Sequence, residues 1–337
     1  MPLSPKAVPV TSPLAADLKS SGKRKLPLKL LLKIVISIAL LFYLFSATGF
    51  EKTLQELSEA NLLLIPACVG IYLLAQLVSA YRWQLLAESI GMNLSLREFY
   101  DYYLMGMYFS LFLPSAIGGD VGRMYYLSKA TGRKKREAAL PVLADRATGL
   151  AALLLLTSLA CLSPISSVVP SSVKWTIFAL TGLGILGFLT VQILPVGPWL
   201  ERFPKLRPFA QAEVYWKNWG LLLKTTGVSM LIHALVVLIH LTIAQALSLT
   251  IDVLYLTMVY GVISLISVIP VTFNGIGLRE GGYQFLLSQY GNIPEHTGLA
   301  FGLYWFLAST FTSLMGGIVL IKGHYKTPAL EELDEEG

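Results

Sequence analysis

The stretch Phe112-Leu-Pro-Ser-Ala-Ile-Gly-Gly-Asp-Val-Gly-Arg123 follows an apolar run that is too short to cross a bilayer. It contains one proline and three glycines, and it carries an acid and a base. Proline removes a backbone donor and glycine permits non-helical dihedral angles, so this segment is predicted to break a helix. Broken backbone at membrane depth is tolerated where protein buries it or where it lines a wet cavity. The stretch therefore predicts a membrane-embedded binding site.

A second stretch, Pro270-Val-Thr-Phe-Asn-Gly-Ile-Gly-Leu-Arg-Glu280, repeats the spacing of the first. In both, a glycine follows the proline after five residues and an arginine follows it after nine. Two interrupted apolar segments in corresponding positions are typical of a transport site built from an inverted repeat. The residues predicted to break the two helices are Pro114, Gly118, Gly119, Pro270, Gly275 and Gly277.

The composition indicates that the solvent of this protein is the bilayer. Of the 337 residues, 55% are hydrophobic and 14% are charged, whereas soluble domains carry about 25% charged residues. The predicted fold class is an all-α polytopic membrane protein with about six spanning helices and two re-entrant helical hairpins. The six apolar runs long enough to span cover residues 30–49, 61–80, 147–165, 173–194, 225–248 and 297–321.

Lysine and arginine are distributed unevenly between the loops, and this predicts the orientation. Residues 1–33 hold seven of these bases and residues 118–138 hold six, so both segments are expected in the cytoplasm. Because bases flank the run 100–117 on both sides, we expect it to re-enter from the cytoplasm, and the run 253–273 to re-enter from outside. The predicted organisation is a disordered basic tail at 1–25, one transmembrane domain at 26–324 and an acidic tail at 325–337. Both termini are then cytoplasmic in a multi-pass protein of the cytoplasmic membrane, and a cleaved signal peptide is the less favoured reading of the start.

Seven ionisable residues in or beside apolar segments form the candidate site. A charge at the bilayer centre costs about 2.5–3.5 kcal/mol on insertion scales, so such groups usually face a cavity or a partner. One hypothesis is that Arg123 and Arg279 hold an anionic headgroup phosphate, because the planar guanidinium donates two parallel hydrogen bonds. The alternatives are ion pairs that fix the hairpins, and acid–base catalysis. The candidates are Arg82, Asp120, Arg123, Asp145, Arg146, Arg279 and Glu280.

Several other patterns are interpreted as structural. His233 and His240 are seven residues apart on one predicted helix, about 10 Å along its axis, which is too far to ligate one ion. The letters of Gly182-Leu-Gly-Ile-Leu-Gly187 match a dinucleotide fingerprint, but they lie in an apolar span, where close packing of small residues explains them better. We assign no catalytic residue, no metal site and no cofactor, and we expect no nucleic-acid partner.

With these residues in view, the chain resembles the transmembrane region of the lysylphosphatidylglycerol synthases, a family also described as flippase-like. The matching signatures occur in the family's order and rough spacing across about residues 30–322. They are Tyr81-Arg82-Trp83, the run from Leu113 to Arg123, Asp145-Arg146, and Gly275-Ile-Gly-Leu-Arg-Glu280. The resemblance implies a polytopic α-helical fold and movement of aminoacylated phosphatidylglycerol between leaflets. It does not imply synthesis of that lipid, because the soluble aminoacyl-transferase domain of the synthases has no counterpart in these residues.

The expected function is binding and translocation of a phospholipid or another phosphate-bearing lipid, with membrane lipids as partners. Transport is favoured over covalent chemistry. One alternative is a membrane-embedded enzyme similar to glycosyltransferases, because other similar proteins are associated with archaeal glycosylation and hopanoid pathways. Another is an accessory subunit that presents lipid to a separate lipid-modifying transferase. A homo-oligomer is compatible with all three hypotheses.

Overall fold

The computed structural model describes residues 28–112, 118–203, 207–269, 271–289, 293–323 and 325. Within these residues the regular structure is helical throughout, as predicted. The α-helices are α2 (Leu28–Thr48), α3 (Phe50–Glu59), α4 (Ile65–Glu88), α5 (Leu96–Phe112), α6 (Gly118–Thr131), α7 (Lys135–Cys161), α8 (Ser171–Ile193), α9 (Val196–Glu201), α10 (Glu213–Lys217), α11 (Trp219–Ala246), α12 (Val253–Ser267), α13 (Leu278–Ser288) and α14 (Glu295–Lys322). Short 3-10 helices cover Leu62–Leu64, Pro164–Val168 and Arg207–Ala212.

Six helices are long and apolar enough to cross a membrane, and they confirm the six predicted spans. They are α2, α4 with its preceding 3-10 turn, α7, α8, α11 and α14. The largest difference is in α7, which begins at Lys135, 12 residues before the predicted start of that span at 147. The charged residues Asp145 and Arg146 lie inside this helix. A span defined by uninterrupted apolar residues therefore starts only after them.

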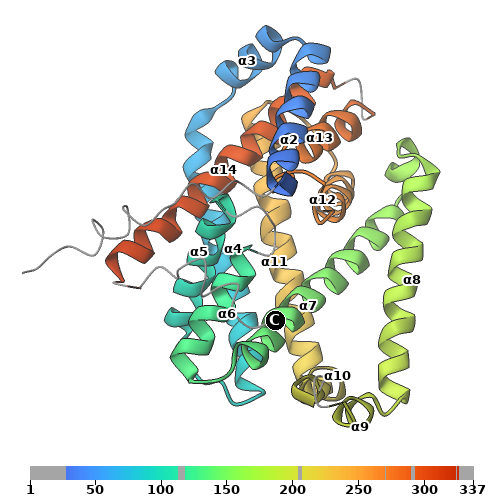
Figure 1. Cartoon of the computed structure of the whole chain (residues 1–337). Helices are drawn as coiled ribbons and strands as arrows, with labels where there is room; N and C mark the ends of the chain where they lie inside the picture. The colour runs from blue at the N-terminus through green and yellow to red at the C-terminus, as the bar shows by residue number, and fades with distance from the viewer. Residues whose placement is uncertain are drawn as a thin grey trace, which may run out of the picture.

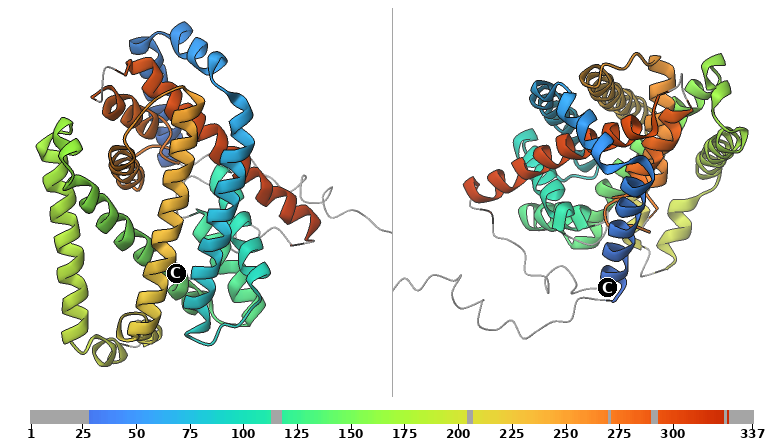
Figure 2. Two further views of the ribbon diagram at one scale, coloured as in Figure 1. Left: turned by 180° about the vertical axis from the view of Figure 1, so that it is seen from behind. Right: turned by 90° about the horizontal axis from the view of Figure 1, so that it is seen from above.

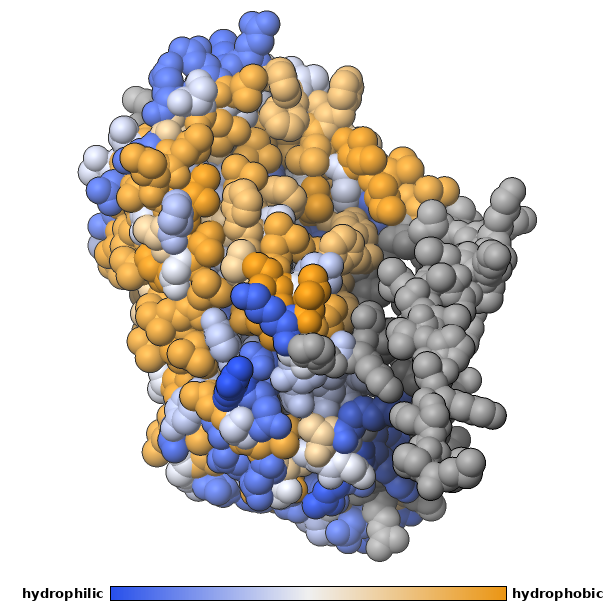
Figure 3. Space-filling model, turned by 90° about the vertical axis from the view of Figure 1, so that its left-hand side faces the viewer, coloured by the Kyte–Doolittle hydropathy of each residue, from blue (hydrophilic) through white to orange (hydrophobic). Residues whose placement is uncertain are grey.

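The surface has the distribution of polarity that a bilayer requires. In Figure 3, hydrophobic side chains cover the middle of the face, while hydrophilic side chains gather towards its two ends. On α8 the large side chains of Leu183, Leu186 and Ile193 are exposed in the isolated chain. Apolar surface of this extent on a helix is stable in contact with lipid. The described part of the chain is therefore a multi-pass membrane protein.

The bundle is organised around α11, which packs along α4 and also contacts α7, α12 and α14. In Figures 1 and 2, α14 crosses the bundle obliquely, and α8 stands at its edge beside α7. The glycines of the 182–187 motif lie on α8, and beyond the adjoining backbone of α8 itself a Cβ added to Gly182, Gly184 or Gly187 would meet no described atom within 4 Å. The predicted small-residue packing is therefore absent from the described part of this chain, because α8 has too few neighbours there.

The connection at 50–60, between the first two predicted spans, is mostly the helix α3. Its apolar residues Phe50, Leu54 and Leu57 recur at helical spacing, which gives the helix one apolar face. Thr297 at the start of α14 donates a hydrogen bond to Glu56 (3.0 Å). The contact fixes α3 across the end of the bundle that Figure 1 shows at the top.

Each stretch predicted to break a helix lies between two short, mutually packed helices. The first pair is α5 and α6, and the second is α12 and α13. Pro114 and Pro270 lie outside the described residues. Gly118 and Gly119 begin α6, while Gly275 and Gly277 adopt positive φ angles of 76° and 85° just before α13. Positive φ is accessible to glycine at little cost, so these two residues let the chain turn into α13.

The α5–α6 pair packs with its backbones in close approach. A Cβ added to Gly106 of α5 would lie 2.8 Å from the carbonyl oxygen of Gly119 and 2.9 Å from Cγ of Arg123. Small residues at such crossings let membrane helices approach closely. Gly106 therefore allows α6 to pack closely against α5, which places Arg123 at this crossing.

Candidate functional site

Asp145 of α7 joins two buried arginines from different helices. Its Oδ1 accepts a hydrogen bond from Nε of Arg82 on α4 (2.8 Å), and its Oδ2 accepts one from Nη1 of Arg123 on α6 (3.2 Å). The side chain of Asp145 is 1% exposed, and those of the two arginines are 7% and 3% exposed. Both carboxylate oxygens of Asp145 are thus occupied by guanidinium donors.

Asp120 extends the group of charges towards the surface. Its Oδ1 accepts from Nη2 of Arg123 (2.6 Å), and its Oδ2 accepts from Nε of Arg146 (3.0 Å). The side chain of Asp120 is 15% exposed and that of Arg146 is 59% exposed. We refer to Arg82, Asp120, Arg123, Asp145 and Arg146 as the arginine cluster. With three arginines and two aspartates (3 − 2), its formal charge is +1, and Arg146 is its most accessible cation.

Neighbouring side chains hold the guanidinium groups of the arginine cluster in place. Nη1 of Arg82 donates to the hydroxyl of Ser229 on α11 (2.8 Å). The guanidinium of Arg123 lies over the rings of Trp83 (5.0 Å) and Tyr103 (4.4 Å), an arrangement that attracts a cation to the ring face. Gly149 leaves room for Arg82, because a Cβ there would lie 3.1 Å from Nη1.

Arg279 and Glu280 form a second ion pair at the start of α13. Glu280 Oε1 accepts from Nε (3.0 Å) and Nη2 (2.7 Å) of Arg279, while its Oε2 accepts from the backbone N–H of Gly277 (2.6 Å). Glu280 is the third residue of α13, and its side chain accepts a hydrogen bond from the backbone of the N-cap residue Gly277. This contact is one half of a capping box. The backbone N–H of Gly277 at this helix start is therefore already bonded to Glu280. The guanidinium of Arg279 also lies 5.6 Å from the ring centroid of Phe306.

The candidate residues form ion pairs both between close sequence neighbours and between distant helices. The neighbours Asp120 and Arg123 do pair, and so do Arg279 and Glu280. Asp145, however, pairs with Arg82 and Arg123, while Arg146 pairs with Asp120. Asp145 and its sequence neighbour Arg146 thus take different partners, because adjacent residues inside a helix point in directions about 100° apart.

In the described part of the chain, the candidate residues form two groups of ion pairs, the arginine cluster and the pair of Arg279 with Glu280. Tyr72 of α4 lies within electrostatic range of both Arg146 and Arg279. Sequence reasoning missed Tyr72 and Ser229. For Ser229 a signal existed, because Thr225, Ser229 and His233 recur every fourth residue on α11 and are all buried.

The described residues contain no group of three or more histidine, cysteine, aspartate or glutamate side chains arranged to hold a metal ion. The acids of the site are paired with arginine instead. What the arrangement offers chemically is positive charge with directed hydrogen-bond donors. Such a set recognises an oxyanion such as phosphate or carboxylate.

These features define a multi-pass α-helical membrane protein with a buried, net cationic group of charges between its helices. More specifically, the chain belongs to the lysylphosphatidylglycerol synthase transmembrane-region family, whose pattern matches residues 30–317. It is also similar to a UPF0104 membrane protein of Pyrococcus horikoshii, at 24% identity over 121 residues. That alignment covers 35% of this chain and 36% of the relative, so about a third of the relative's length is matched. No solved structure gives a significant match.

Proposed function

We propose that this protein binds the phosphate of a lipid headgroup at the arginine cluster and moves the lipid between the leaflets of the cytoplasmic membrane. One observation carries the proposal. The arginine cluster has a formal charge of +1, and the side chain of Arg146 is 59% exposed, whereas the side chains of Arg82 and Arg123 are buried. Arg146 is held by Asp120, which is itself partly exposed. A phosphate can therefore replace or share this partner without breaking the contacts of Asp145.

The state of the acids favours transport over the alternative of a membrane-embedded transferase. Such an enzyme needs a carboxylate free to accept a proton. Both oxygens of Asp145 and both oxygens of Glu280 accept hydrogen bonds, and Asp120 accepts from two arginines. The oxygens that would take up this proton are therefore already occupied by hydrogen-bond donors. The accessory-subunit alternative differs from our proposal in requiring a second protein for any movement of lipid.

Replacing Arg146 with glutamine tests the headgroup site. Arg146→Gln is expected to slow the exchange of an anionic, fluorescently labelled phospholipid between leaflets of proteoliposomes by about 10- to 100-fold. The reason is that hydrogen bonds to charged groups contribute about 1.5–3 kcal/mol. Exchange is measured by quenching with dithionite from outside. Arg133→Gln is the matched control, because Arg133 is an exposed arginine that pairs with Glu137 outside the cluster. Equal exchange rates for the Arg146 variant and the unchanged protein would contradict the proposed site.

The two short helix pairs supply the broken backbone of this proposed mechanism. We propose that α5–α6 and α12–α13 re-enter the membrane from opposite faces as an inverted repeat. Their helices contain 17, 14, 15 and 11 residues, and about 20 residues are needed for a full crossing. Rocking of the two halves about the breaks would then expose the site to each side in turn.

Labelling of single cysteines tests the orientation of the first pair. In a background lacking Cys68 and Cys161, cysteines are introduced at Asn93, before α5, and at Lys134, after α6; both positions are exposed. Both are expected to react with a membrane-impermeant maleimide from the cytoplasmic side. Reaction from opposite sides would show that the pair crosses the membrane, and it would remove the re-entrant hairpin from the mechanism.

A further inference from the structure

The helix α8 is held against the bundle at two separate places. In its first half Ile177 is buried, and the hydroxyl groups of Thr181 and of Ser158 on α7 share a hydrogen bond (2.8 Å). Near its end, the ring centroid of Phe188 lies 5.9 Å from that of Trp219, where α11 begins. Figures 1 and 2 show α7 and α8 diverging from the first of these places towards the second. The residues in between show how the space is lined.

The side of α8 that faces the bundle is open between the two contacts. This side is marked by residues that follow one another at intervals of four, three and four positions and so share one face of the helix: Ile177, Thr181, Gly184 and Phe188. Gly184 is exposed, and beyond the adjoining backbone of α8 itself a Cβ added there would meet no described atom within 4 Å. The face therefore touches the bundle before and after Gly184, whereas Gly184 borders open space.

The side of α7 that faces α8 is open over the matching length. Ser158 marks this side, because its hydroxyl bonds that of Thr181. Ala151 and Ala147 lie seven and eleven residues before Ser158, about two and three full turns, so they share its side of the helix. Both alanines are exposed. A methyl group from α7 and a glycine from α8 leave space between the helices, and we refer to the space bordered by Ala147, Ala151 and Gly184 as the α7–α8 opening.

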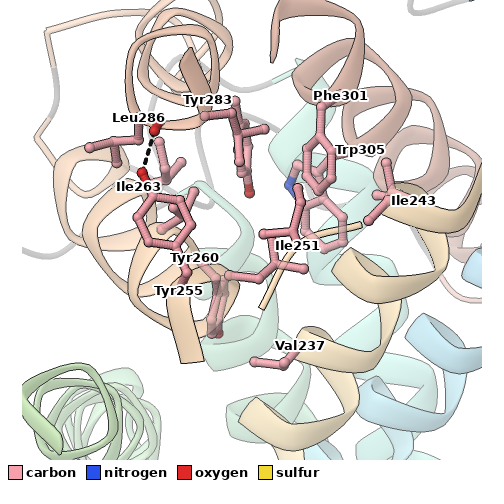
Figure 4. Packing of buried hydrophobic residues seen from close by; sticks show 14 of the residues in the cluster. Val237, Ile243, Ile251, Tyr255, Tyr260, Ile263, Tyr283, Leu286, Phe301 and Trp305 are labelled. Carbon is pink, nitrogen blue, oxygen red and sulfur yellow. Dashed lines mark hydrogen bonds between the residues drawn. The ribbon is translucent and has the colours of Figure 1, made fainter. Parts of the chain in front are cut away.

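The α7–α8 opening differs from the closely packed interior around α11. There, large buried side chains from three helices fill the space, as Figure 4 shows for Tyr255 of α12, Tyr283 of α13 and Trp305 of α14. Beside the opening, by contrast, Leu150 of α7 and Leu223 of α11 are exposed. Both are apolar and lie in spanning helices. The opening is therefore accessible from the hydrocarbon of the bilayer, and what fills it there is apolar.

The most accessible cation of the arginine cluster stands at the edge of the opening. Arg146 directly precedes Ala147 on α7, and Leu150, four positions later, is its neighbour on the helix surface. The side chain of Arg146 is 59% exposed and is held by the carboxylate of Asp120 (3.0 Å). From Arg146 to Ala151 the helix advances about 7.5 Å. An aliphatic chain attached to a phosphate at Arg146 can therefore pass along Leu150 into the opening.

We propose that the α7–α8 opening holds an acyl chain of the lipid whose phosphate is bound by Arg146; this rests on the proposed function and extends it from the headgroup to the hydrocarbon part of the substrate. A cation beside an apolar opening complements a molecule that joins an anionic group to an aliphatic chain. Lipid tails are as apolar as leucine, so burial alone does not draw one chain out of the bilayer in preference to another. The charge of Arg146 is what retains the phosphate-bearing lipid, and occupancy of the opening depends on both features.

Photolabelling of the full chain in phosphatidylcholine nanodiscs identifies the occupant. Two probes carry the same diazirine at the end of one acyl chain: phosphatidic acid, and diacylglycerol, which lacks the phosphate. Each is added in trace amount, and labelled residues are located by mass spectrometry after irradiation. Phosphatidic acid is expected to label the α7–α8 opening about tenfold more than diacylglycerol does, a ratio that corresponds to about 1.4 kcal/mol. Leu186, which is 61% exposed on the opposite face of α8, is the internal reference and is expected to be labelled equally by both probes.

Three variants assign the labelling to the cation and to the opening. Arg146→Gln removes the charge, so phosphatidic acid and diacylglycerol are expected to label the opening equally. Gly184→Phe places a ring in the opening, where it meets no described atom at Cβ beyond α8 itself. It is expected to reduce labelling of Ala147 by phosphatidic acid about tenfold, or about 1.4 kcal/mol. Leu186→Phe is the matched control, because it adds the same ring to the opposite face of α8, and its labelling pattern is expected to equal that of the unchanged protein.

The outcomes separate the acyl-chain site from the proposed function. Labelling of the opening that requires both the phosphate and Arg146 supports the site, and it does so even if the protein exchanges no lipid, a result that would overturn translocation alone. Equal labelling by the two probes at Gly184 and at Leu186 identifies surrounding bilayer lipid only and overturns the site. Lipid exchange that still depends on Arg146 would then leave the proposed function standing. An opening that neither probe labels, with Leu186 labelled, is filled by protein such as a second copy of the chain, and this also overturns the site.

Discussion

Replacement of Asp145 by asparagine is expected to lower the free energy of unfolding by about 3–5 kcal/mol, the usual cost of removing one partner from a buried ion pair. Asp145 is 1% exposed and is the shared partner of Arg82 and Arg123. An asparagine has nearly the same shape but no charge, and its amide group offers donors where the arginines require acceptors. Arg82 would keep one hydrogen bond to Ser229, and Arg123 would keep Asp120. The measurement is reversible unfolding of the detergent-solubilised protein by denaturant, followed by tryptophan fluorescence.

Asp120→Asn provides the comparison that isolates burial as the cause. Asp120 also accepts from two arginines, but it is 15% exposed and one of its partners, Arg146, is 59% exposed. Water can therefore solvate much of the charge that this change leaves unpaired. We expect a loss of about 1–2 kcal/mol, in the range of ordinary hydrogen bonds. Equal losses of unfolding free energy in the two variants would show that the deeper burial of Asp145 is not the cause of its larger expected contribution.

The positions of the spanning helices could be predicted because the bilayer imposes a minimum apolar length on each of them. The two interrupted stretches were equally visible, since a proline and several glycines in an apolar context conflict with a continuous helix. Gly275 and Gly277 show the reason for this conflict, because both adopt positive φ angles in the structure. Such signals depend only on a few neighbouring residues, so they can be recognised in a single sequence.

The pairing of charges could not be predicted, because it depends on how distant helices rotate against each other. Arg82 and Asp145 are 63 positions apart, and Arg82 and Ser229 are 147 apart. No short spacing encodes such contacts. The histidines of α11 illustrate the same limit. Their spacing along one helix is visible in the sequence, but their hydrogen-bond partners Tyr260 and Tyr283 come from other helices.

The ion pair of Arg279 and Glu280 is expected to be strongly coupled, so that removing both charges costs less than the sum of removing each. Glu280 is 1% exposed and Arg279 is 14% exposed. Glu280→Gln leaves a guanidinium without its counterion, and Arg279→Met leaves a buried carboxylate with the N–H of Gly277. Each single change is expected to cost about 3–5 kcal/mol. In the double variant no unpaired charge remains, and the glutamine oxygen can still accept from Gly277, so at least about 2 kcal/mol of the summed loss should be recovered.

The same double variant separates the structural role of this pair from a role in binding the headgroup. If Arg279 contributes to the proposed site, the double variant should regain stability in denaturant unfolding but still exchange the labelled anionic phospholipid more slowly than the unchanged protein. Its expected rate is about tenfold lower, since a hydrogen bond to a charged group contributes about 1.5–3 kcal/mol. Recovery of both stability and exchange would assign Arg279 and Glu280 to holding the start of α13. The headgroup site would then consist of the arginine cluster alone, because the remaining cations of the proposed site are Arg82, Arg123 and Arg146.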